Sequence, residues 1–314
     1  MDEYSHDDAW DDPAKVLSLL ARSIVDNQLV LVLGAGASMG CGLPSWGDLV
    51  QNAHELARVP RAAKVDDNAA IEALAHTMQD TPGRFLQVIK DALYSTREPV
   101  TGALKPFVEQ SALRSELLEA ICTVVMLSCR RGHGTLVTFN FDDLAETYLM
   151  RRGIFAYPYS NQPDWFHNED VSVLHPHGFL SRRPMFPSSE SIALTALDFD
   201  NIIGDVTNPW HVRLLSLFQS AIPLFVGLSG TDKNLSNLIT KARGTHVSKA
   251  TGRRYWGIRL CVEGDPNIDT WKHRGVWCET FAHYNEIPDY LMKVCHASAE
   301  MLVQAKLFAG EGRV

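Results

Sequence analysis

The five residues from Leu29 to Leu33 form an unbroken apolar run, Leu-Val-Leu-Val-Leu, that ends at Gly34. A run this short, with a β-branched residue at alternate positions, is typical of a strand that is buried on both faces. Such strands lie in the middle of parallel sheets, whose two faces are covered by helices. The chain is therefore expected to alternate strands and helices around a central strand at 29–33.

The rest of the chain continues this alternation. It predicts an α/β fold with a doubly wound, mostly parallel, Rossmann-like sheet, whose ligands lie beyond the carboxyl ends of the strands. Residues 60–132 show helical patterns at 68–79, 83–94 and 111–129 and no strand of comparable strength, so they are predicted to be a helical insertion or cap within a single domain spanning 1–314. Further strands are predicted at 135–140, 171–174, 223–227, 255–262 and 276–281, and further helices at 13–26, 45–57, 142–152, 209–220, 232–242 and 287–307.

Composition argues against several classes of protein. The net charge of −8 at pH 7 gives no electrostatic footprint for nucleic-acid binding. No apolar run approaches the roughly 18 residues of a membrane span. The acidic segment from Met1 to Asp12 is unlike a secretory signal, so a cytoplasmic protein is expected. None of the six cysteines forms a CxxC pair, which favours buried free thiols over a zinc site, and no bound metal is expected.

The segment Gly34-Ala35-Gly36-Ala37-Ser38 directly follows the first predicted strand. Glycines at such a turn let the backbone approach a pyrophosphate, whose charge nearby amide groups stabilise. The spacing departs from the Rossmann fingerprint, because Met39 occupies the position of its third glycine, and there is no P-loop motif. The segment is predicted to bind a nicotinamide dinucleotide, and a merely structural tight turn is the alternative.

Polar and titratable residues follow the next two strands. Asn140 and Asp142 come after the strand at 135–140. An asparagine side chain can donate to and accept from a ribose or an amide, whereas an aspartate here could equally cap the next helix. His175 and His177 follow the strand at 171–174, and histidine titrates near neutrality, so either is a candidate general base. The alternatives are a histidine that only bonds a loop, or a metal pair, for which the sequence shows no further ligand cluster.

The strand at 223–227 ends in glycine and hydroxyl residues, Gly227-Leu228-Ser229-Gly230-Thr231, followed by Asp232. These residues could meet the second half of a dinucleotide. They could also be an ordinary strand-to-helix turn with a cap. The spacing is not that of the Gly-x-Ser-x-Gly elbow of a hydrolase, because the second glycine directly follows Ser229.

Taken in order, these segments resemble the signatures of the sirtuin superfamily. The family's signatures are Gly-Ala-Gly-x-Ser with Gly-x-Pro, then Thr-Gln-Asn-x-Asp, a catalytic His-Gly and a late Gly-hydroxyl segment. They span residues 34 to about 238 in the family's order, which implies a sirtuin-like NAD-binding domain. The matching segments are Gly34 to Ser38, Gly42-Leu43-Pro44, Thr138-Phe139-Asn140-Phe141-Asp142, His177-Gly178 and Gly227-Leu228-Ser229.

Departures from these signatures indicate a particular branch. Protein-deacylating sirtuins carry a four-cysteine zinc module, which this sequence cannot build. The family's Asp-Phe-Arg is replaced by Ser45-Trp46-Gly47-Asp48, and Phe139 stands in place of glutamine. The chain is similar instead to the zinc-lacking sirtuin-like domains of bacterial anti-phage defence systems, in Pro44-Ser45-Trp46 and in Val226-Gly227-Leu228-Ser229 leading to Asp232-Lys233-Asn234-Leu235. That resemblance implies an NAD+ hydrolase, with NAD as substrate, that cleaves the bond between nicotinamide and ribose.

The resemblance assigns the catalytic work to Asn140 and His177. Asn140 would hold the ribose hydroxyls, and His177 would polarise a hydroxyl or a water as an oxocarbenium-like centre forms. The residues implied to bind NAD are Gly34, Ala35, Gly36, Ser38, Pro44, Trp46, Thr138, Asp142, Gly227, Ser229 and Asp232.

An unregulated NAD hydrolase would harm its host, so the resemblance also implies a gate. The gate could be homo-oligomerisation, or a partner such as a HerA-type ATPase or a short Argonaute. Two other interpretations stay open. One is a non-catalytic module that senses NAD or ADP-ribose, and the other is an NAD-dependent protein deacylase, against which the missing zinc module argues.

Overall fold

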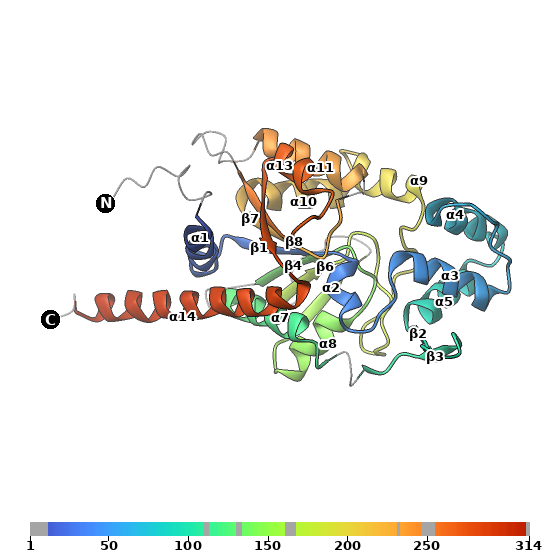
Figure 1. Ribbon diagram of the computed structural model, residues 1–314, viewed down its shortest axis with the longest axis horizontal. Helices are drawn as coiled ribbons and strands as arrows, with labels where there is room; N and C mark the ends of the chain where they lie inside the picture. Colours follow the sequence, from blue (N-terminus) through green and yellow to red (C-terminus); the bar gives the residue numbers. More distant parts are fainter. Residues whose placement is uncertain are drawn as a thin grey trace.

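The computed structural model describes residues 12–109, 113–129, 134–160, 168–230, 233–245 and 255–311. Its centre is a seven-stranded sheet in the order β5-β6-β4-β1-β7-β8-β9, in which all neighbouring strands run parallel (Figure 1). After β1 the chain builds one half of the sheet and then the other, so the predicted doubly wound sheet is confirmed. The strands are β1 (Leu29–Leu33), β4 (Gly134–Thr138), β5 (Ala156–Tyr159), β6 (Val171–Leu174), β7 (Ile222–Val226), β8 (Gly257–Val262) and β9 (Val276–Phe281).

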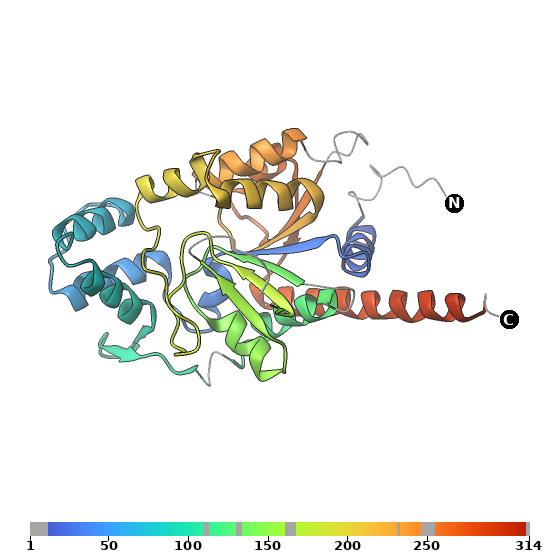
Figure 2. The ribbon, with the colours of Figure 1, turned by 180° about the vertical axis from the view of Figure 1, so that it is seen from behind.

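Helices cover both faces of the sheet because its central strands are apolar on both sides. Leu31 and Leu33 of β1 pack into one core, on the face covered by α1 (Pro13–Val25), α7 (Glu116–Ser128) and α14 (Ile287–Glu311). Val30 and Val32 point into the opposite core. That face is covered by α10 (Pro209–Ser220), α11 (Lys233–Thr245) and α13 (Ile268–His273), which are seen from behind in Figure 2.

Part of the segment 60–132 lies away from the sheet. The predicted helices at 68–79 and 83–94 are confirmed as α4 (Asp67–Thr77) and α5 (Pro82–Leu93), and both pack beside α3 (Trp46–Ala57) at one end of the molecule (Figure 1). By contrast, α7 packs against β1, β4 and α14. The remaining elements are α2 (Ala35–Met39), the hairpin β2 (Ser95–Arg97) and β3 (Leu104–Pro106), α8 (Leu144–Arg151), α9 (Ala196–Phe199), the π-helix η2 (Asp200–Gly204) and the 3-10 helix η3 (Tyr284–Glu286).

Several features of the structure differ from the sequence prediction. The strands β2 and β3 have three residues each, too few for a periodic signal. The strand β5 contains Pro158, which normally argues against a strand but is tolerated at the edge of a sheet, where β5 lies. The helix predicted to begin at Asp142 begins at Leu144.

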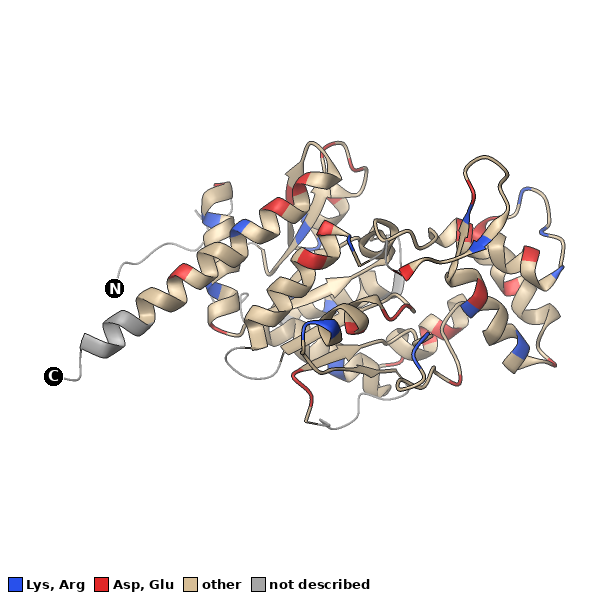
Figure 3. Cartoon of the chain, turned by 90° about the horizontal axis from the view of Figure 1, so that it is seen from below, with Lys and Arg blue, Asp and Glu red and all other residues tan. Residues whose placement is uncertain are grey.

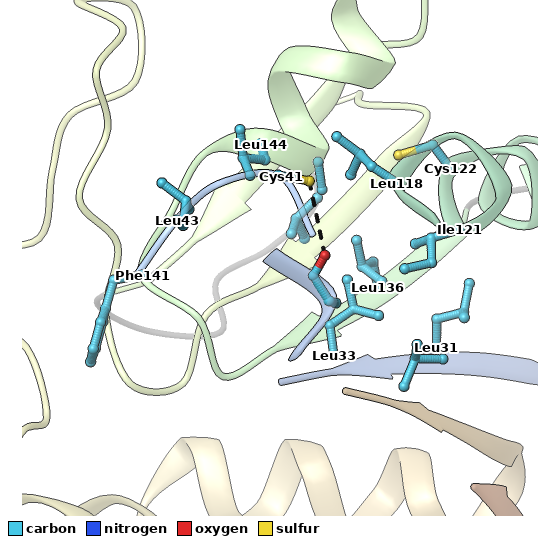
Figure 4. Close-up of a cluster of buried hydrophobic side chains, with 14 of the residues drawn as sticks. Leu31, Leu33, Cys41, Leu43, Leu118, Ile121, Cys122, Leu136, Phe141 and Leu144 are labelled. Carbon is cyan, nitrogen blue, oxygen red and sulfur yellow. Dashed lines mark hydrogen bonds between the residues drawn. The ribbon is translucent and has the colours of Figure 1, made fainter. Parts of the chain in front are cut away.

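The segment that follows β1 is held by a compact apolar cluster, drawn in Figure 4. Leu33 of β1 lies in this cluster with Leu136 of β4 and Ile121 of α7. Cys41 points into the same cluster and donates its thiol hydrogen to the Ala37 carbonyl at 3.9 Å. Burial raises the pKa of Cys41 to about 11, so its thiol is uncharged at neutral pH. The turn after β1 is therefore anchored in the apolar core.

Charged side chains of both signs are spread over the elements rather than gathered by sign, as Figure 3 shows for one face. Within the described ranges, no helix is both long and apolar enough to span a bilayer.

Candidate functional site

The turns after β1 and β7 pack directly against each other at the carboxyl end of the sheet. The N–H groups of Gly34 and Gly36 donate to the carbonyls of Val226 and Gly227, both at 3.0 Å. A Cβ atom on Gly36 would lie 2.8 Å from the Gly227 Cα. Gly227 has a φ of +72°, and a Cβ there would lie 2.3 Å from the Ala37 nitrogen. These glycines allow two backbones to approach closely, and two of their amides are already engaged within the protein.

A directed chain of hydrogen bonds joins the turn after β1 to the turn after β4. The Asn140 Nδ2 donates to the Gly34 carbonyl at 3.0 Å and to Ser38 Oγ at 2.9 Å, and Ser38 Oγ donates to Asp142 Oδ2 at 2.7 Å. The amide nitrogen must face Gly34 because a carbonyl only accepts. The Asn140 Oδ1 is therefore the free acceptor of this side chain, and none of the described residues donates to it.

Six of the predicted site residues line one small cavity of about 80 Å³: Ala35, Ser38, Pro44, Trp46, Asn140 and Asp142. Apolar side chains, including Leu43 and Phe139, complete its wall. Trp46 is fixed there by a 3.0 Å hydrogen bond from its Nε1 to Asn68 Oδ1. The structure thus brings these six residues together on the wall of one cavity.

Asp142 is a buried carboxylate that has two roles at once. One oxygen accepts from Ser38, and the other accepts from the N–H of Leu144 at 3.1 Å and so caps the start of α8. Burial raises the pKa of Asp142 to about 6, although these hydrogen bonds oppose the rise. Its neighbour Asp143 is instead ion-paired, with Oδ1 2.6 Å from Nη2 of Arg182.

His177 lies on a separate cavity of about 430 Å³. Its ring packs between Phe139 and Phe199, with centroid separations of 4.8 and 4.5 Å. Its Nε2 is buried and has no hydrogen-bond partner among the described residues. Burial lowers the pKa of His177 to about 3, despite a hydrogen bond to the Phe139 backbone, so the imidazole is neutral at neutral pH. The other walls of this cavity include Ser160, Glu190, Asn208 and Trp210.

A larger cavity, of about 840 Å³, lies beside the turns after β1 and β7, where the two halves of the sheet diverge. Ala35 lines both this cavity and the small one, so the two adjoin. In doubly wound folds this divergence is the usual place for a ligand. Four predicted residues line the large cavity: Ala35, Gly36, Gly227 and Ser229.

Arg259 lines this cavity and was not predicted from the sequence. It is 4% exposed, its Nε donates to the Leu228 carbonyl at 2.9 Å, and its Nη2 lies 2.5 Å from Asp265 Oδ2. Its Nη1 is buried and has no hydrogen-bond partner in the described part of the chain. The signal that could have revealed it is a charged residue inside the apolar strand Gly-Ile-Arg-Leu-Cys-Val. Tyr284 and Asn285, which also line the cavity, gave no comparable signal.

Two of the remaining predicted residues act as supports. Gly34 accepts from Asn140, and Thr138 Oγ1 accepts from the Asn140 N–H at 3.1 Å. Asp232 lies outside the described residues. In the part of the chain that the structure describes, no group of three or more His, Cys, Asp or Glu residues could hold a metal ion.

Residues 134–270 match the family model of the SIR2-like domain. The match includes Asn140, Asp142 and His177 and leaves out the turn after β1, and it supports the resemblance to sirtuins. A solved structure described as "Structural Basis for the Mechanism and Regulation of Sir2 Enzymes" is 12% identical, with a TM-score of 0.44 over 91% of this chain and 98% of that chain. At that score the likeness adds nothing to the fold described above. No curated protein matches the sequence.

Proposed function

We propose that this protein is an NAD+ hydrolase that releases nicotinamide and leaves ADP-ribose. The observation that carries the proposal is the chain from Asn140 through Ser38 to Asp142, which ends in a buried carboxylate on the wall of a small cavity. That cavity adjoins a much larger one at the divergence of the sheet. The match of residues 134–270 to the SIR2-like domain adds support, because sirtuin-type domains act on NAD.

Of the two adjoining cavities, the larger suits one half of a dinucleotide, and the smaller, of about 80 Å³, admits part of the other half. The larger one, about 840 Å³, is within the range of ligand pockets and takes the adenosine half. The unpartnered Nη1 of Arg259 is a donor for that half, and a buried donor gains most from being paired by a ligand. The pyrophosphate then crosses Ala35, and the nicotinamide ribose reaches Asn140 in the smaller cavity.

The reaction needs a hydrogen-bond acceptor for the ribose hydroxyls and a negative charge near the ribose. The Asn140 Oδ1 accepts a ribose hydroxyl hydrogen, since its Nδ2 is already held by the protein. The Asp142 carboxylate stabilises the positive charge that develops on the ribose as the glycosidic bond breaks. The bonding electron pair passes to the nicotinamide ring nitrogen, which loses its charge. Water adds to the ribose carbon, and the proton it loses goes to a base. His177 Nε2 is the candidate once the ring leaves the apolar contacts whose burial lowers its pKa to about 3.

Phe139 bears on the role of His177. Its ring contacts the His177 ring, and it also lines the cavity of Asn140, whereas His177 lies on the other cavity. This separation is the observation that favours the second candidate function, a module that binds NAD or ADP-ribose without cleaving it. In the hydrolase, the side chain of Phe139 has to move before His177 can serve the ribose held by Asn140.

The biological role that we propose is that of an NAD-depleting effector in bacterial anti-phage defence, acting in the cytoplasm. It rests on the resemblance of the segments at 34–48 and 226–235 to the zinc-lacking branch of sirtuin-like domains. Activity would be gated by homo-oligomerisation or by a sensor protein, such as a HerA-type ATPase or a short Argonaute.

The test is nicotinamide release from NAD+ by the purified chain, alone and with the product of its neighbouring gene. Asn140→Ala and His177→Ala should each abolish release, whereas His76→Ala, at an exposed position on α4 that lines none of these cavities, should not. Unchanged release in both site variants would contradict the site. Tight binding of ADP-ribose without turnover, even with the partner present, would establish the sensor instead.

A further inference from the structure

His175 and Glu146 form a fully buried pair directly behind Asn140. Both side chains have no exposed surface, and His175 Nε2 lies 2.6 Å from Glu146 Oε1. The other ring nitrogen, Nδ1, lies 3.0 Å from the backbone carbonyl oxygen of Asn140. The ring packs on Phe179, 4.6 Å between centroids. Of the two histidines that follow β6, His177 therefore lies on a cavity and His175 points into the protein.

The hydrogen atoms of this pair can be assigned from their partners. A carbonyl oxygen only accepts, so Nδ1 must carry a hydrogen and donate it to Asn140. The contact between Nε2 and the carboxyl group also requires a hydrogen, on either atom. The pair thus exists as imidazolium with carboxylate or as imidazole with carboxylic acid. In both forms Glu146 keeps the Nδ1 hydrogen directed at Asn140, since a ring with its only hydrogen on Nε2 would set a lone pair against the carbonyl.

Asn140 depends on this support because it lies two residues beyond the end of β4. Its N–H donates to Thr138 Oγ1, its carbonyl accepts from His175, and its side-chain nitrogen is shared by Gly34 and Ser38. Every polar group of Asn140 other than Oδ1 is thus held by the protein.

Glu146 is also tied to the site by position. It lines a void of about 10 Å³ together with Ser38, Thr138, Asn140 and Asp142. The helix α8, which supplies Glu146, begins at the residue that Asp142 caps. A shift of His175 and Glu146 would therefore displace residues that surround the proposed ribose site.

We propose that His175 and Glu146 are positioning residues, which fix the peptide of Asn140 and so direct its Oδ1 into the small cavity. The inference rests on the proposed function in one respect, namely that Oδ1 receives a ribose hydroxyl. The pair itself does not touch the ligand. Misplacement of a catalytic group by about 1 Å can lower turnover roughly 100-fold. Loss of the pair should therefore lower kcat far more than it raises KM, because the other contacts to the dinucleotide remain.

The decisive variants are His175→Phe with Glu146→Leu together, and Glu146→Gln alone. The double variant keeps an apolar core of similar volume and removes the hold on the Asn140 carbonyl. Glu146→Gln keeps it, because its amide donates to Nε2 while Nδ1 still donates to Asn140. We expect kcat to fall by roughly 10- to 100-fold in the double variant and to remain within about threefold of wild type in Glu146→Gln. If the double variant does not fold, Glu146→Leu alone should lower kcat in the same direction.

A matched control is His54→Phe, which removes another buried histidine whose two ring nitrogens contact the backbone carbonyls of Val59 and Ala70. It should lower thermal stability and leave kcat unchanged. If His54→Phe and the double variant lower kcat alike, or Glu146→Gln loses as much as the double variant, the pair has no positioning role.

A second readout does not need turnover. In protein labelled with ¹⁵N-asparagine, the side-chain amide resonances of Asn140, assigned by their loss in Asn140→Ala, should shift or broaden in the double variant and stay in place in Glu146→Gln and His54→Phe. Unmoved resonances in the double variant would overturn the inference. If the wild-type protein neither binds nor cleaves NAD+, the proposed function fails, and these resonances still decide whether His175 and Glu146 position Asn140.

Discussion

Asp142→Asn should stabilise this protein while impairing its activity. The carboxylate of Asp142 is buried, and its pKa is raised from 3.8 to about 6. Because the folded state holds the proton more tightly than the unfolded state, the stability from this group is fully present below pH 3.8 and is lost as the pH rises to about 6. At roughly 1.4 kcal/mol for each pH unit, the ionised carboxylate costs about 3 kcal/mol above pH 6.

Asparagine removes that cost and keeps part of the hydrogen bonding. Its Oδ1 can accept from the Leu144 N–H, and its amide can donate to Ser38 Oγ, which must then turn its own hydrogen elsewhere. Exchanging a charged acceptor for a neutral one costs roughly 1–2 kcal/mol. The net gain is therefore about 1–2 kcal/mol near pH 7.5, seen as a rise in Tm of a few degrees.

The pH dependence separates this explanation from a general packing effect. Between pH 4.5 and pH 7.5, the advantage of Asp142→Asn over wild type should grow by about 2 kcal/mol. Nicotinamide release should fall at least about tenfold, since the negative charge beside the ribose is lost. Urea unfolding and nicotinamide release measure the two effects on the same samples.

The adjacent residue provides a control of opposite sign. Asp143 is fully buried and paired with Arg182, so Asp143→Asn should destabilise the fold by about 3–5 kcal/mol. The reasoning is refuted if Asp142→Asn destabilises the protein as Asp143→Asn does, or if its effect on stability is the same at both pH values.

Three further outcomes are expected. Gly227→Ala should destabilise the fold by about 2 kcal/mol or more in thermal unfolding, because its Cβ would lie 2.3 Å from the Ala37 nitrogen. Gly264→Ala, also at positive φ but with nothing within 4 Å of its Cβ, should cost less stability. Equal losses of stability in the two variants would contradict the packing argument. His177→Phe should make the stability of the protein less sensitive to acid. Burial lowers the His177 pKa from 6.5 to about 3, so the contribution of neutral His177 to folding stability is present above pH 6.5 and is lost as the pH falls. A drop in Tm between pH 7 and pH 4.5 that is the same in variant and wild type would exclude this explanation. Phe139→Ala should raise nicotinamide release by the isolated chain, and Phe199→Ala should not. Both rings pack on His177, but of the two only Phe139 also lines the Asn140 cavity. Unchanged release by a folded Phe139→Ala variant would show that the Phe139 ring is no barrier.

The residues that the sequence predicts well are those whose position follows from the sheet alone. Ser38, Asn140 and Asp142 follow β1 and β4, which pair directly, so their meeting is a consequence of parallel strands that end at the same edge. Pro44 and Trp46 were assigned only by resemblance, and they line the same cavity. The direction of each hydrogen bond was not predictable, because it depends on side-chain rotation that the pattern does not encode.

The site features that the sequence did not predict depend on contacts between distant segments. The glycine turn after β1 has the sequence pattern of a phosphate-binding site. In the structure, however, the N–H groups of Gly34 and Gly36 donate to the carbonyls of Val226 and Gly227, at the end of β7. Arg259 comes from a strand whose side chains were expected to be buried, and it lines the cavity only because the turn after β7 lies beside it. The His177-Gly178 signature singles out His177, but no local pattern gives the role of His175, because its partner Glu146 is on α8, 29 residues earlier in the chain.

The position of Phe139 connects the site to the question of control. In the structure, Asn140 and His177 line different cavities. Phe139 lines the cavity of Asn140, and its ring packs on the ring of His177. A glutamine, which the sirtuin signature has at this position, would not stack on the imidazole as this ring does. The contact helps to hold His177 in an apolar environment, in which a neutral ring with a lowered pKa is stable. If the proposed hydrolase is gated, the gate has to move the Phe139 side chain, whereas the Asn140–Ser38–Asp142 chain is already formed.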